Sequence, residues 1–234
     1  DQSVRYTDSQ SFVPRGPWRS VAHTQHTFFT ESVMDELAHD AGKDPFEYRR
    51  ALLKDQPRHL AVLEMAAAKG GWGTPLPDGR TRGIAIQKSF KTIVAEVAEV
   101  SVSAEGEVKV HKVTAVVDCG EVINSDTARQ QVESGIIFGL TAALYGEITI
   151  ANGAVEQSNF PDYEMVRMAD VPEIDVHFIE SGAEIGGLGE PATPVVSAAV
   201  ANAVFAATGK RVRSLPLKNH DLTPLSNKLA QAAD

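Results

Sequence analysis

The alternation of apolar and polar positions predicts three helices in the first third of the chain. The first spans Phe28–Ala38, because Phe29, Val33 and Leu37 recur at helical spacing, and it ends near Gly42. Asp44-Pro45-Phe46-Glu47 combines a cap, a first-position proline and a capping-box acid, so it starts a second helix. A third runs from Pro57 to Gly70-Gly71, and residues 1–26 before the first helix are expected to be irregular.

The pattern then changes to the period of β-strands. Segments 83–89, 92–103 and 107–117 are rich in Val and Ile with partial alternation, and Glu105-Gly106 suits a tight turn between the last two. We expect three antiparallel neighbours. Segments 147–150 and 154–157 flank Ala151-Asn152-Gly153, which predicts a further hairpin, and one more strand passes through Ile174–Ile179.

Two further helices carry the features of interest. Ser125 or Asp126 can cap one that contains Gly135 and Gly139, which lie one turn apart and permit close approach by another backbone or a flat ligand. Pro191 is expected to open the last helix and Gly209 to close it. The chain is therefore predicted to be α+β, with mixed or antiparallel sheets and packed helices, in one domain over residues 1–234.

Glu190 would then lie at or beside the N-cap of the last helix, after the glycine-rich run Gly186-Gly187-Leu188-Gly189. Glutamate caps helices poorly, since caps favour Ser, Thr, Asp or Asn. The glycines let a ligand approach the backbone, and the helix start favours an anion or an electron-rich group. The alternative is an acidic first-turn residue that interacts with the helix dipole.

Composition and charge limit the possible partners. The 234 residues carry a formal net charge of -9 and no basic run interleaved with aromatics, which argues against nucleic acid as a partner. No stretch is apolar enough to span a bilayer.

The single cysteine, Cys119, excludes an internal disulfide and an all-protein iron-sulfur cluster. His23 and His26 are interpreted as polar residues near a helix start, and no protein metal ligands are predicted. Because the chain starts at Asp1 without an initiator methionine, we expect a mature product, a subunit or a fragment.

Three segments, in order and spacing, resemble the molybdenum hydroxylases of the xanthine oxidase family, in the branch of isoquinoline 1-oxidoreductase and bacterial aldehyde dehydrogenases. They are Gly16–His23, Asp118–Leu140 and Gly187–Pro191. The resemblance covers nearly the whole chain but only the carboxyl-terminal part of the family's molybdopterin-binding large subunit. It implies a molybdenum-cofactor-binding domain, and it implies that Glu190 is the general base that takes the proton from a metal-bound hydroxyl.

The resemblance also implies which residues meet the cofactor: Trp18, Arg19, Ser20, Gln131 and Gly189. Ser20, Val21 and Ala22 stand where the family commonly has Gly, Phe and Gly, so Val21 cannot supply an aromatic contact and a purine substrate is not expected. The plainer alternatives are core packing for Trp18, a surface ion pair for Arg19 and a helix-surface amide for Gln131.

The implied enzyme oxidises an N-heteroaromatic or an aldehyde with water as oxygen donor, and is inactive as an isolated chain. Its cofactor would be molybdopterin, in the cytosine dinucleotide form of bacterial members, and its electrons would leave through [2Fe-2S] clusters on a small subunit. The remaining amino-terminal part of the large subunit would be a second partner. The resemblance points to the periplasm, with the cytoplasm as the alternative.

Two other functions stay open on the sequence. One is a noncatalytic scaffold or interaction subunit that retains the fold. The other is a hydrolase in which Glu190 works with a second carboxylate such as Glu184 or Asp162.

Overall fold

The computed structural model describes residues 5, 7, 12–14 and 16–225. Its centre is a four-stranded sheet in the order β1-β2-β3-β6. Strands β1 (Arg80–Ser89), β2 (Thr92–Val102) and β3 (Val108–Asp118) are antiparallel neighbours, as predicted, and β6 (Glu173–Phe178) pairs parallel to β3. The α+β prediction with a mixed sheet is confirmed.

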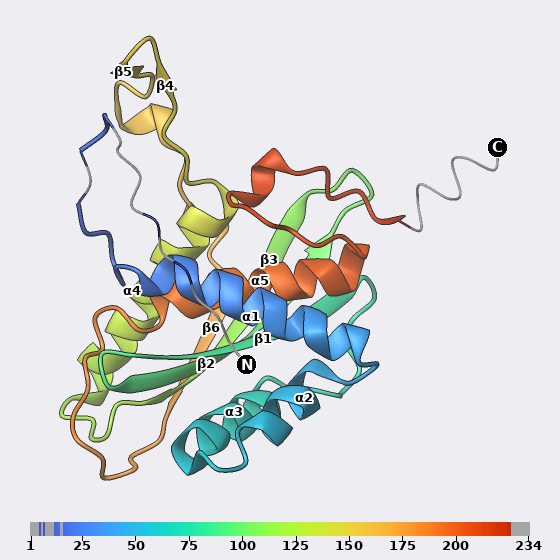
Figure 1. Cartoon of the computed structure of the whole chain (residues 1–234), viewed down its shortest axis with the longest axis vertical. Coiled ribbons are helices and arrows are strands. Elements are labelled where there is room, and N and C mark those ends of the chain that lie inside the picture. Colours follow the sequence, from blue (N-terminus) through green and yellow to red (C-terminus); the bar gives the residue numbers. More distant parts are fainter. Residues whose placement is uncertain (1–4, 6, 8–11, 15, 226–234) are drawn as a thin grey trace.

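Helices cover both faces of this sheet (Figure 1). On one face, α3 (Pro57–Lys69) packs Val62 and Leu63 against Ile84 and Ile93. On the other face lie α5 (Thr193–Thr208) and α4 (Ser125–Leu144), which share the larger core with β2 and β3. The remaining elements are α2 (Pro45–Leu52), the short turns η1 (Phe160–Asp162) and η2 (Leu217–Asn219), and the hairpin of β4 (Ile150–Ala151) and β5 (Ala154–Val155), which projects as an arm.

Helix α5 is apolar all round because it is enclosed on several sides. It contacts the sheet, α4 and α1 (His23–Asp40), and most of its residues are buried. Gly83 lets it approach β1 closely, since a Cβ there would lie 2.1 Å from the carbonyl oxygen of Ala199. Gly209 ends the helix in the left-handed conformation, as predicted.

Helix α1 exposes to solvent the apolar face from whose spacing the sequence predicted the helix. Phe29, Val33 and Leu37 are exposed, whereas Glu31 and Asp35 are buried. The reason is the edge of β1: the N–H of Ile86 donates to Glu31 Oε2 at 3.0 Å. A buried carboxylate therefore pairs with a backbone group that the open edge of the sheet would otherwise leave without a partner.

Four local predictions need correction. Helix α1 starts at His23, so residues 23–26 are helical, and the rest of the predicted irregular segment lies partly outside the described residues. Asn124, rather than Ser125 or Asp126, caps α4 by accepting from the Thr127 N–H. The arm pairs only two residues on each side. Helix α5 begins at Thr193, not Pro191, because residues 191–192 form a turn and Pro194 takes an early helical position.

Candidate functional site

The glycine-rich loop before α5 is held by the ends of two strands. The Gly186 N–H donates to the carbonyl oxygen of Cys119 at 2.9 Å, just after β3. The Gly187 N–H donates to the carbonyl oxygen of Phe90 at 2.9 Å, and Thr92 Oγ1 donates to the Gly187 carbonyl oxygen at 2.7 Å. Hydrogen bonds to the tip of the β1–β2 hairpin therefore fix the loop just before Glu190.

The glycines of this loop differ in what surrounds them. A Cβ on Gly186 would lie 2.3 Å from Thr92 Oγ1, so this glycine makes room for the hairpin rather than for a ligand. A Cβ on Gly189 would have Gln131 Oε1, at 3.7 Å, as its nearest neighbour. Gly189 is thus the loop glycine with open space beside it. On α4, Gly135 and Gly139 face the start of α5, so the predicted close approach is made by another backbone.

Glu190 does not lie at or beside the N-cap of α5, as the sequence predicted. The N-cap of α5 is Ala192, and the Thr193 N–H donates to the Glu190 carbonyl oxygen at 3.0 Å. Glu190 therefore precedes the N-cap by two residues and does not cap the helix. Its side chain is half-buried and turns toward the segment that leads into α1.

Two hydrogen bonds join that segment to the loop, 170 residues away in sequence. The backbone N–H of Ser20 donates to Glu190 Oε1 at 2.8 Å. Arg19 Nε donates to the carbonyl oxygen of Gly189 at 2.7 Å. Among the described residues, Glu190 Oε2 has no hydrogen-bond partner. The Ser20 N–H thus holds one carboxylate oxygen, and the described residues supply no donor to the other.

Arg19 is bound on its other side by α4. Its Nη1 donates to Ser134 Oγ at 3.0 Å, and Nη2 lies 3.5 Å from the Gln131 carbonyl oxygen. Burial lowers the pKa of Arg19, and the nearby Glu190 carboxylate opposes that shift. The guanidinium therefore ties three segments together through hydrogen bonds to the protein itself.

Aromatic side chains extend the cluster along α4. The Trp18 ring lies 4.7 Å from the Phe138 ring, centroid to centroid, and Arg19 Cζ lies 5.5 Å from the Phe138 centroid. A largely apolar pocket of about 500 Å³ begins here, lined by Trp18, Ser134, Ile137, Phe138, Thr141, Tyr163, Met165 and Val166. Trp18 is 40% exposed, so it is not simply a core residue.

All six predicted site residues meet in this cluster, which we call the Glu190 site: Trp18, Arg19, Ser20, Gln131, Gly189 and Glu190. Their predicted roles toward a cofactor stay predictions. Sequence reasoning missed Ser134 and Phe138, although their spacing of three and seven from Gln131 places them on the same helix face. It also missed Phe90 and Thr92, for which the sequence carries no signal.

The carboxylates considered for a hydrolase lie elsewhere. Glu184 is exposed and pairs with Lys91 at the hairpin tip. Asp162, the last residue of η1, accepts hydrogen bonds from Ser158 and Asn159. Neither carboxylate shares a hydrogen-bond partner with the Glu190 side chain among the described residues. The described residues also include no group of three or more His, Cys, Asp or Glu that could hold a metal ion.

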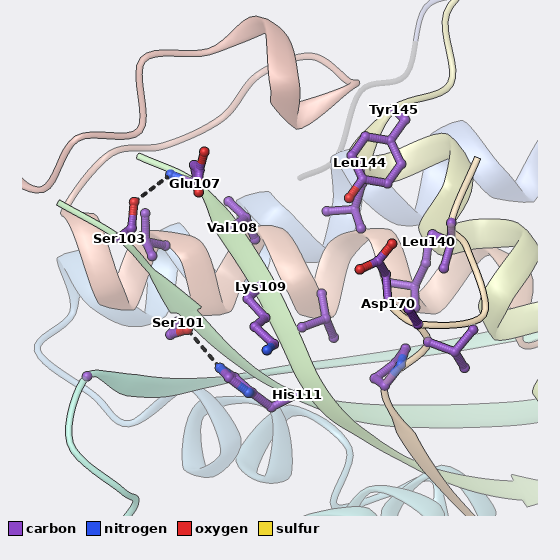
Figure 2. A pocket seen from close by; sticks show the side chains of 17 residues that line it. Ser101, Ser103, Glu107, Val108, Lys109, His111, Leu140, Leu144, Tyr145 and Asp170 are labelled. Carbon is purple, nitrogen blue, oxygen red and sulfur yellow. Dashed lines mark hydrogen bonds between the residues drawn. The ribbon is translucent and has the colours of Figure 1, made fainter. Parts of the chain in front are cut away.

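Figure 2 shows another pocket, of about 750 Å³. It lies between the start of β3, the end of α4 and the segment before β6, and none of the six predicted residues lines it. Ser101 Oγ and His111 Nε2 are 2.7 Å apart at its rim.

Within residues 5, 7, 12–14 and 16–225, no helix is long and apolar enough to cross a membrane.

Comparison with known proteins agrees with this arrangement. Residues 30–172 match the model of the molybdopterin cofactor-binding domain. The chain is 34% identical over 233 residues to a membrane-bound aldehyde dehydrogenase [pyrroloquinoline-quinone] of Gluconacetobacter polyoxogenes, covering 91% of this chain and 30% of that protein. It is also 34% identical over 204 residues to the isoquinoline 1-oxidoreductase subunit beta of Brevundimonas diminuta, covering 86% and 26%.

The fold is shared with a solved enzyme. The aldehyde oxidoreductase from Desulfovibrio desulfuricans superposes with a TM-score of 0.71 at 14% identity, over 86% of this chain and 40% of that one. The chain spans less than a third of the length of the two curated relatives. It belongs to the molybdopterin cofactor-binding domains found in the large subunits of the xanthine oxidase family.

Proposed function

We propose that the chain is the catalytic carboxyl-terminal portion of a molybdenum hydroxylase, and that Glu190 is its general base. The observation that carries the proposal is the meeting of three distant segments around one carboxylate. The Ser20 N–H donates to Glu190 Oε1, and Arg19 Nε donates to the carbonyl oxygen of the neighbouring Gly189. Among the described residues, Glu190 Oε2 has no hydrogen-bond partner. A carboxylate with one oxygen held and the other free is suited to accept a proton at a defined position.

The polar groups of the site fit a pterin cofactor. The Gln131 side-chain amide, which can both donate and accept, has no partner among the described residues, and Gly189 leaves open space beside it. Ser20 Oγ is buried and has no hydrogen bond to any other described residue. These groups would hold the cofactor, with Trp18 and Arg19 supporting the loop beside it. When bound, the molybdenum cofactor supplies the redox chemistry that transfers oxygen from water to the substrate.

The chain's own residues then have separable roles. Glu190 Oε2 accepts the proton, while the Ser20 N–H holds Oε1. Arg19 keeps Gly189 and α4 at a constant separation through its hydrogen bonds. The apolar pocket beside Trp18 and Phe138 favours a flat, poorly hydrated substrate, which supports an N-heteroaromatic or an aromatic aldehyde as the substrate class.

The assembly we propose is larger than this chain. Its partners are the remaining amino-terminal part of the large subunit and a small subunit carrying [2Fe-2S] clusters. The cofactor is proposed to be the cytosine dinucleotide form of molybdopterin, and the periplasm is the proposed compartment. The alternative is a noncatalytic scaffold subunit, which predicts no molybdenum after cofactor-competent expression.

Replacement of Glu190 by Gln in the complete, cofactor-loaded enzyme tests the proposal. We expect molybdenum content to stay unchanged, because the side chains are nearly equal in size, and turnover to fall by about 10²- to 10⁴-fold. Glu184→Gln is the matched control, since Glu184 lies in the same segment but is exposed and pairs with Lys91. Near-normal turnover of Glu190→Gln would refute the proposal.

A further inference from the structure

The backbone that faces Glu190 has an unusual conformation. Ser20 has φ = 75° and Val21 has φ = 49°, both in the left-handed region that L residues rarely adopt and that a β-branched residue strongly disfavours. The Val21 N–H donates to the Trp18 carbonyl oxygen at 2.7 Å, and the His23 N–H donates to that of Ser20 at 3.0 Å. A tight turn thus separates Trp18 from the start of α1.

This turn determines where the Ser20 amide points. Its N–H is directed at Glu190 Oε1, 2.8 Å away, and Ser20 is fully buried. Strained backbone persists only where the surrounding structure holds it, and it is concentrated at functional sites. Here the surroundings are specific: Arg19 Nε binds Gly189, Thr24 Oγ1 donates to the Arg19 carbonyl oxygen at 3.0 Å, and α1 follows at once.

We infer that the left-handed Ser20–Val21 turn is a positioning element for the general base: its Ser20 N–H holds Glu190 Oε1 so that Oε2 faces the reacting atoms. The inference rests on the proposed function and adds to it a backbone group. The Ser20 side chain is not needed for this role, because the donor is the amide. Misplacement of a reacting group by about 1 Å can cost about 10²-fold in rate, so loss of this hydrogen bond should lower kcat.

The hydrogen bond can be tested without cofactor, by NMR of the 234-residue chain. In the ¹⁵N-labelled protein we expect a downfield Ser20 amide proton that exchanges slowly with solvent. Glu190→Ala should move it upfield and speed its exchange, while the control Glu184→Gln should leave it unchanged. A Ser20 resonance that is indifferent to Glu190→Ala would overturn the inference.

To measure the effect of this hydrogen bond on catalysis, the backbone N–H of position 20 has to be replaced in the loaded enzyme. Ser20→Ala and its ester counterpart, with L-lactic acid at position 20, differ only by replacement of the amide N–H with oxygen. We expect the ester to have a kcat about tenfold to a hundredfold below that of Ser20→Ala, with KM changed less than about twofold. An ester at position 22 is the backbone control, because the Ala22 N–H has no acceptor among the described residues.

The outcomes separate this inference from the proposed function. If Glu190→Gln is inactive and the two position-20 variants have equal kcat, the turn does not position the base and only the inference is wrong. If Glu190→Gln is active, the proposed function is wrong and the inference falls with it. A fall in kcat that the position-22 ester reproduces would also overturn the inference, because it would reflect general weakening of the turn.

Discussion

Gly139 of α4 packs directly against the backbone of Thr193, the first residue of α5. A Cβ on Gly139 would lie 2.4 Å from the Thr193 carbonyl oxygen and 2.6 Å from Val196 Cγ1. This contact brings α4, which carries Gln131 and Ser134, next to the turn that carries Glu190. Helix packing therefore decides the width of the Glu190 site.

Gly139→Ala is expected to destabilise the protein by about 1–3 kcal/mol, because the added methyl group meets a backbone atom that cannot move away alone. Urea unfolding monitored by circular dichroism measures the loss. Gly16→Ala is the control, since a Cβ there meets no atom of the described residues within 4 Å. Equal unfolding midpoints for the two variants would contradict the packing described.

Gly189→Ala is expected to separate stability from cofactor binding. The nearest atom to the added Cβ is 3.7 Å away, so the free energy of unfolding should change by less than about 1 kcal/mol. In the complete enzyme, the methyl group would occupy the open space assigned to the cofactor, and molybdenum content should fall. Full molybdenum content would argue against Gly189 as a cofactor contact.

The buried cation Arg49 is expected to be essential for stability. It is 2% exposed, and its Nε lies 2.9 Å from Glu31 Oε2, the carboxylate that also receives the Ile86 N–H. Arg49→Met leaves that carboxylate buried without its cation, which should cost about 3–5 kcal/mol. The adjacent Arg50 pairs with Glu47 on the surface, both about half exposed, so Arg50→Met should cost less than about 1 kcal/mol. Chemical denaturation of both variants provides the comparison.

Glu96 is expected to make stability depend on pH. It is fully buried in β2 between Ala85 and Ala115, and neither of its carboxylate oxygens has a hydrogen-bond partner in the described part of the chain. Burial raises its pKa well above the usual value. The folded state therefore keeps a proton that the unfolded state releases above about pH 4.3. Its contribution to stability is full below that pH and is lost as pH rises through the folded pKa.

Glu96→Gln removes this titration while it keeps the shape of the side chain. Near pH 4 the unfolding free energies of the variant and the wild type should depend on pH in a similar way. Above that, the difference in unfolding free energy should shift in favour of Gln by about 1.4 kcal/mol per pH unit until Glu96 ionises in the folded state. Urea titrations between pH 4 and 8 measure the shift, and parallel pH curves for the two proteins would show that Glu96 is not buried as described.

Much of the architecture was predictable because it follows from local chemistry. The cap at Asp44, the prolines at the starts of α2 and α3, and the strand runs that became β1, β2 and β3 act over a few residues. The start of α5 was predicted two residues early, because Pro191 and Pro194 both suit a helix start and only the turn at residues 190–193 distinguishes them. The exposed face of α1 was not predictable, since Glu31 is buried by a contact with β1, 55 residues away.

The sequence by itself determined the elements, the family and the identity of the six candidate residues, because periodicity, caps and motifs are carried by neighbouring positions. Tertiary structure alone decided that Ser20 binds Glu190 through its backbone amide and that Arg19 donates its hydrogen bonds to Gly189 and α4. It also decided that Gly186 packs against the β1–β2 hairpin, whereas Gly189 has open space beside it. Those relationships join segments more than 90 residues apart, and packing and hydrogen bonding between such segments leave no pattern in the local order of residues.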